Sequence, residues 1–65
     1  MPTKSLQEHL FQQVKEKLLP QTPLVDAVAE VLHLSNDSAY RRIRGETPLV
    51  LEEVQTLCNT YNISL

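Results

Sequence analysis

The sequence contains very little cysteine, glycine or aromatic residue. One cysteine, one glycine, one phenylalanine, two tyrosines and no tryptophan occur among its 65 residues. A single cysteine excludes an internal disulfide framework and a multi-cysteine metal site, and it fits a reducing compartment. We therefore expect a cytoplasmic protein. No apolar run reaches the roughly 18 residues of a membrane span, so we expect no membrane partner.

Signals for β-strands are also missing. Apolar and polar residues do not alternate with a period of two, and one glycine leaves little for hairpin turns. Hydrophobic residues make up 42% of the chain, which is typical of a folded globule. The length allows one domain with a single core. We therefore predict an all-α fold in which residues 1–65 form one compact domain.

Apolar spacing predicts the helices. The first is expected over about residues 5–19 and ends before Pro20, with one apolar face of Leu6, Leu10, Phe11, Val14 and Leu18. A pair of helices is expected over about residues 22–44, where Thr22 caps the start and Pro23 takes the first helical position. The last is expected over about residues 51–61. Asn62 then provides a left-handed stop, and Ile63 and Leu65 fold back onto the core.

Residues 35–45 are the most informative segment. Ser35 is a good N-cap and Gly45 a good left-handed stop, so a short helix is expected between them. Ala39 and Ile43 define its inward side. Arg41, Arg42 and Arg44 represent half of the six lysines and arginines in the chain. Such a helix is expected to present its surface to a partner.

The distribution of charge supports this view. The net charge of −2 argues mildly against a nucleic-acid partner. Residues 35–45 nevertheless sum to +2, from three arginines and one aspartate, whereas residues 46–65 sum to −3 from three glutamates. A polyanion would therefore meet its positive charge on one helix.

Taken together, these residues resemble a known family. Val28, Ala29, the run Leu32-His33-Leu34-Ser35, Ala39, and Arg44-Gly45 are similar to the helix-turn-helix of phage lambda repressor-like (Xre-type) transcription regulators. The segment from Pro48 to Glu53 resembles the start of that family's fourth helix. The resemblance covers residues 22–65. It implies a lambda repressor-like fold of four helices, with a fifth in the full-length protein.

The same resemblance implies a function. It identifies the chain as the N-terminal part of a longer bacterial or phage transcription regulator that binds double-stranded DNA sequence-specifically, usually as a homodimer. The third helix would lie in the major groove. The chain departs from the family pattern at His33, where glycine is usual, at Arg42, where a hydrophobic residue is usual, and at Val50, where serine or threonine is usual.

On this resemblance, the candidates for DNA contact on the third helix are Asn36, Asp37, Tyr40, Arg41 and Arg44. Arginine matches the two major-groove acceptors of guanine, and asparagine can pair similarly with adenine. Asp37 suits an i, i+4 pair with Arg41 better than a position beside phosphates. Gln21 and Thr22, with the free N–H groups of the second helix, are candidates for holding a phosphate.

Other interpretations of the same residues remain open. A run of arginines on a helix is often only a solvated face. A helix-turn-helix that docks a partner protein without binding DNA also fits the acidic balance and Asp37. Catalysis has no support, because the sequence shows no nucleophile–base pair, phosphate-binding glycine loop or metal-spaced cluster. We expect no enzymatic activity, no cofactor and no metal.

Overall fold

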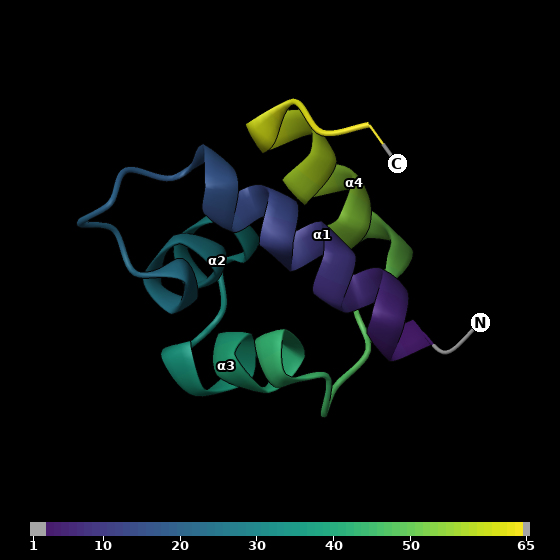
Figure 1. The fold of residues 1–65 in the computed structure, drawn as a ribbon. Helices are drawn as coiled ribbons and strands as arrows, with labels where there is room; N and C mark the ends of the chain where they lie inside the picture. The colour runs from purple at the N-terminus through teal and green to yellow at the C-terminus, as the bar shows by residue number, and fades with distance from the viewer. Residues whose placement is uncertain (1–2, 65) are drawn as a thin grey trace.

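The structure is a computed structural model that describes the backbone of residues 3–64 and the side chains of residues 6–64. These residues form four helices: α1 (Thr3–Lys17), α2 (Leu24–Leu32), α3 (Asn36–Arg44) and α4 (Leu51–Tyr61). No strand occurs in the described part of the chain, so the predicted all-α class is confirmed. Helix α2 packs against α3 and α4, and α1 packs across the same two helices (Figure 1). No helix in this part of the chain is long and apolar enough to cross a membrane.

The core lies where the four helices meet. Its buried side chains are Leu10, Phe11, Val14, Val28, Ala29, Ala39, Leu57 and Ile63. Fully burying a leucine, valine or phenylalanine contributes about 1.5–3 kcal/mol, so these few residues provide most of the stabilisation. Ala29 of α2 and Ala39 of α3 carry no bulk beyond Cβ, which allows the two helices to approach closely. The core therefore fixes α3 against α2.

Helix α1 differs from its prediction at both ends and on one face. It spans Thr3–Lys17 instead of residues 5–19, because the chain turns before Pro20 and the Leu18 N–H donates to the Lys15 carbonyl at 3.2 Å. Leu18 still packs against the core. The prediction that Leu6 belongs to the buried face is wrong: Leu6 is 59% exposed, and Gln7 is buried at 5% exposure.

The burial of Gln7 is explained by its hydrogen bonds. Its Nε2 donates to the carbonyls of Arg42 at 2.8 Å and Thr47 at 2.9 Å, and its Oε1 accepts from the Leu49 N–H at 3.1 Å. A buried polar side chain is costly unless such partners are present. One amide therefore ties α1 to the end of α3 and to the loop that leads into α4.

The start of α2 lies one or two residues later than predicted. Thr22 does not cap the helix and Pro23 is not its first helical residue. Pro23 itself is the N-cap, with φ −65° and ψ 139°, and its carbonyl accepts from the Ala27 N–H at 3.2 Å. Its extended ψ excludes it from the helix, and among the described side chains none caps the first N–H groups of α2.

Three helices end at a left-handed residue, as the sequence predicted for Gly45 and Asn62. His33, Gly45 and Asn62 adopt left-handed φ angles of 57°, 83° and 57°. After each of them the next N–H bonds back to a carbonyl five residues earlier, which satisfies a free carbonyl of the helix end. Ile63 is buried as expected, whereas Leu65 lies outside the described residues.

Replacement of Gln7 tests whether its amide holds the α3–α4 loop. Gln7→Leu keeps the side-chain volume but leaves the Thr47 carbonyl and the Leu49 N–H without partners, each at a cost of about 1–3 kcal/mol if water does not replace them. The Arg42 carbonyl loses one of two hydrogen bonds and keeps the Gly45 N–H at 3.1 Å. We expect a loss of at least about 2 kcal/mol in the free energy of unfolding, measured by urea denaturation. Gln12→Leu is the control, because Gln12 is exposed on the same helix. Equal unfolding midpoints for the two variants would contradict the assigned role.

Replacement of Gly45 tests the end of α3. Gly45→Ala places a Cβ in a left-handed conformation and should cost about 1 kcal/mol in a thermal or urea melt. Gly45→Asn should lose less, since asparagine visits this conformation more readily. The boundary of α3 would be wrong if Gly45→Ala were as stable as the natural chain.

Candidate functional site

A three-residue connection joins α2 to α3. His33, Leu34 and Ser35 separate the two helices. The Ser35 hydroxyl accepts from the Ser38 N–H at 3.2 Å, which confirms Ser35 as the N-cap of α3. Because Ala39 is buried and Ile43 packs against the core, the opposite side of α3 faces solvent. The geometry of the turn therefore decides which side chains a partner meets.

All five candidates on α3 are exposed. The structure brings them together on the solvent-facing side of one helix: Asn36, Asp37, Tyr40, Arg41 and Arg44. Gln21 and Thr22 lie apart from them, in the turn that precedes α2. Gln21 is exposed, whereas Thr22 is half-buried and its N–H donates to the Leu19 carbonyl at 3.0 Å.

The two outermost arginines have acidic partners. Arg41 Nη2 lies 3.2 Å from Asp37 Oδ2, which confirms the predicted i, i+4 pair. Arg44 Nε lies 3.0 Å from Glu46 Oε2, and its guanidinium sits 5.4 Å from the centre of the Tyr40 ring. Both ion pairs are more than half exposed on average, so each contributes only about 0–1 kcal/mol to stability. Their main effect is to order the guanidinium groups on the surface.

Asn36 also has a partner that the sequence did not reveal. Its Nδ2 donates to Asp26 Oδ1 at 2.9 Å, from the first residue of α3 to the first turn of α2. The two residues are ten positions apart across the turn, beyond any local pairing rule. The side-chain Oδ1 of Asn36 and the second N–H of its Nδ2 make no hydrogen bond within the described residues. An asparagine uses a side-chain oxygen and an N–H of this kind to recognise the edge of an adenine.

Arg42 stabilises the fold and does not belong to the exposed face of α3. Its Nε lies 3.0 Å from Glu53 Oε1, with both side chains only 16% and 15% exposed, and its Nη1 donates to the Ser38 carbonyl at 3.2 Å. Glu53 Oε1 also accepts from the N–H of Val50, the N-cap of α4, at 3.1 Å. Valine has no side-chain acceptor, so this is half of a capping box. A glutamate three residues after an N-cap is the sequence signal that could have indicated the capping role of Glu53.

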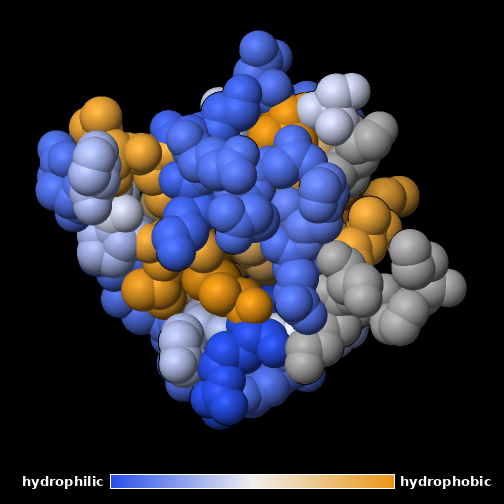
Figure 2. All heavy atoms as spheres, viewed as in Figure 1, coloured by the Kyte–Doolittle hydropathy of each residue, from blue (hydrophilic) through white to orange (hydrophobic). Residues whose placement is uncertain are grey.

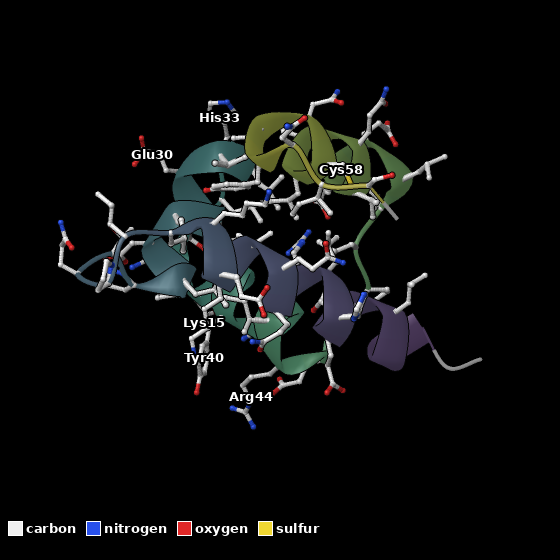
Figure 3. All side chains as sticks on the ribbon, turned by 45° about the horizontal axis from the view of Figure 1, so that its top comes forward. Lys15, Glu30, His33, Tyr40, Arg44 and Cys58 are labelled. Carbon is white, nitrogen blue, oxygen red and sulfur yellow. The ribbon has the colours of Figure 1, made fainter. Side chains whose placement is uncertain are left out.

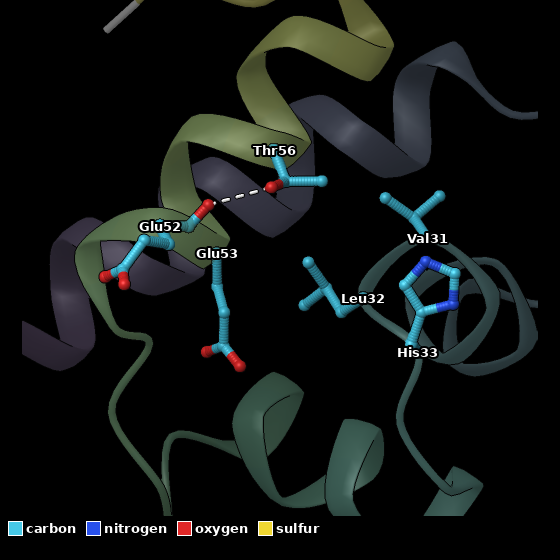
Figure 4. Close-up of a pocket in the computed structure, with 6 residues that line it drawn as sticks. All are labelled: Val31, Leu32, His33, Glu52, Glu53 and Thr56. Atoms are coloured by element: carbon cyan, nitrogen blue, oxygen red, sulfur yellow. Dashed lines mark hydrogen bonds between the residues drawn. The ribbon is translucent and has the colours of Figure 1, made fainter.

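Two surface hollows lie beside α3 and α4. One lies between the end of α2 and the start of α4, lined by Val31, Leu32, His33, Glu52, Glu53 and Thr56 (Figure 4). Its two carboxylates disfavour an anionic ligand. The other lies between α1, the start of α2 and α3. Within the described residues, no group of three or more His, Cys, Asp or Glu side chains is arranged to hold a metal ion.

Two ionisable side chains lie on the side of the molecule opposite to Tyr40 and Arg44. In Figure 3, Glu30 and His33 point away from the side that carries Tyr40 and Arg44. Burial raises the pKa of the Tyr61 phenol, and the carboxylate of Glu30 raises it further. Tyr61 therefore stays neutral and packs against the core.

Two helices joined by a three-residue turn, the second with outward arginines, define a small helical domain of helix-turn-helix type. The chain belongs to the BetR domain family, whose model matches residues 5–65. No curated protein and no solved structure matches it significantly.

The structural role of Arg42 can be tested against its neighbour. Arg42→Met removes a partly buried ion pair and a bond to a carbonyl, and should lower the free energy of unfolding by about 1.5–3 kcal/mol. Arg41→Met should change it by less than about 0.5 kcal/mol, because the Asp37 pair is exposed. A double-mutant cycle of Arg42→Met with Glu53→Gln should give a coupling energy above about 0.5 kcal/mol in urea melts. Additive losses would show that the two side chains act independently.

Proposed function

We propose that this domain binds double-stranded DNA as part of a transcription regulator, with α3 in the major groove. The observation that carries the proposal is the exposed face of α3, which follows a short turn and presents Arg41 and Arg44 beside Asn36 and Tyr40. Arginine and asparagine are the side chains that best match guanine and adenine edges. Membership of the BetR domain family supports a DNA-binding regulatory role.

Each candidate residue has a distinct part in this proposal. Arg41 and Arg44 exchange their carboxylate partners for base or phosphate acceptors when α3 docks. Asn36 offers its free carbonyl and N–H to a base, while Asp26 fixes the orientation of its amide. Tyr40 donates its hydroxyl to a phosphate. The uncapped N–H groups at the start of α2, near Gln21 and Thr22, face a phosphate of the DNA backbone.

The wider context follows from the resemblance to lambda repressor-like regulators. We propose a regulator from a bacterium or phage that acts in the cytoplasm, without catalytic activity, and binds two half-sites as a homodimer. In such an arrangement the half-sites are about one helical turn of DNA apart. The cytoplasmic location and the homodimer are proposals about the whole regulator and not about this domain alone.

A second candidate function is a protein-interaction module without DNA binding. The carboxylates favour it, since Asp26, Asp37 and Glu46 lie beside only two exposed arginines on α3. A surface of paired charges with an exposed tyrosine also suits a protein partner. The two candidates differ in how strongly their binding depends on salt.

Duplex selection followed by a salt titration tests the proposal. A fluorescent duplex enriched from a random pool should bind with an affinity that falls steeply with salt, measured by anisotropy. Arg41→Ala and Arg44→Ala should each cost about 1–3 kcal/mol on that duplex, because each removes a fork that a base can accept. Lys17→Ala is the control for a lost charge elsewhere. No enrichment and no salt-dependent binding would overturn the proposal in favour of the interaction module.

A further inference from the structure

The cations of the described chain fall into two groups. Each arginine of α3 has a carboxylate within 3.2 Å: Asp37 for Arg41, Glu53 for Arg42 and Glu46 for Arg44. Among residues 6–64 the lysines are Lys15 and Lys17, both on α1 and both exposed, and neither takes part in an ion pair. A phosphate must therefore compete with a carboxylate for each arginine, but not for a lysine of α1.

Lys15 lies on the side of α1 that faces α3. It borders a groove of about 230 Å³ together with Ile43 of α3 and Leu24, the first residue of α2. The exposed carboxylate of Glu8 also lines this groove and reduces its attraction for an anion, but it forms no ion pair with Lys15. Figure 2 shows apolar atoms exposed between the polar side chains of α1 and those of α3. In Figure 3, Lys15 projects to the same side of the molecule as Tyr40 and Arg44. The ammonium group thus stands at the edge of the α3 face.

The start of α2 lies at the same groove. Leu24 lines it, and the first N–H groups of α2 have no side-chain cap. Uncapped N–H groups and the positive end of the helix dipole favour an anion, although Asp26 in the first turn reduces this preference. A lysine on a flexible stem beside this helix end adds a point charge that suits a phosphate.

We propose that Lys15 binds a phosphate of the DNA backbone, so that the interface extends from the helix-turn-helix onto α1. This inference rests on the proposed function. The arginines of α3 reach the base edges, and Lys15 holds the strand that flanks them. Because no carboxylate has to be displaced, Lys15 contributes attraction that the paired arginines supply only after they exchange partners.

Lys17 provides a matched control on the same helix. Two residues correspond to about 200° around an α-helix, so Lys17 points to nearly the opposite side of α1 from Lys15. Lys15→Gln and Lys17→Gln remove the same charge from exposed positions and change the net charge equally. A difference in DNA affinity between the two variants is therefore due to the position of the lost charge and not to the change in net charge.

The experiment measures the affinity of both variants for the selected duplex across a series of salt concentrations. Lys15→Gln should weaken binding and reduce the slope of log affinity against log salt by about 0.9, the value for one lost phosphate contact. Lys17→Gln should leave the slope unchanged, and Lys15→Arg should keep it because the charge is retained.

The outcomes separate this inference from the proposed function. If the unmodified chain binds DNA and depends on Arg41 and Arg44, but Lys15→Gln and Lys17→Gln have equal slopes, the role of Lys15 is refuted while the proposed function stands. If the unmodified chain shows no salt-dependent binding to the duplex, the proposed function and this inference both fail. Circular dichroism spectra of the two variants confirm that the helices are intact.

Discussion

The loop between α3 and α4 depends above all on the side-chain amide of Gln7. This single group satisfies a carbonyl at the end of α3, a carbonyl in the following loop and an N–H just before α4. Apolar packing alone would leave the Thr47 carbonyl and the Leu49 N–H without partners in a part-buried place, which is unfavourable, whereas the Arg42 carbonyl would keep the Gly45 N–H. The core determines how close α3 lies to its neighbours, Gly45 ends α3, and the amide holds the loop that follows. The exposed face of α3 depends on all three.

The three arginines of α3 have two different roles: one stabilises the fold, and two are available to a partner. Arg42 and Glu53 are largely buried and connect the flank of α3 to the first turn of α4. Arg41 and Arg44 remain at the surface, where Asp37 and Glu46 keep them ordered and partly neutralised. A surface of this kind has little attraction for nucleic acid at long range but offers well-placed donors at contact. Specific recognition with weak general affinity follows from that balance.

Features that depend on a few neighbouring residues could be predicted from the sequence. The helix ends at Gly45 and Asn62, the cap at Ser35 and the Asp37–Arg41 pair are all decided within about five positions. The burial of Gln7 could not be predicted, because its partners lie 35 to 42 residues along the chain. The partners of Asn36 and Arg42 are ten and eleven residues away, so tertiary packing was needed to find them.

The left-handed residues at helix ends have a consequence for the denatured chain. Two of the three, His33 and Asn62, carry a Cβ. Each adds native strain of about 1–2 kcal/mol at most, yet each also restricts the unfolded backbone more than glycine would. A chain of 65 residues has little core from which to offset conformational entropy. With one glycine in its sequence, it has less of that entropy to lose. Part of the stability of this domain therefore comes from the small number of conformations that its unfolded chain can adopt.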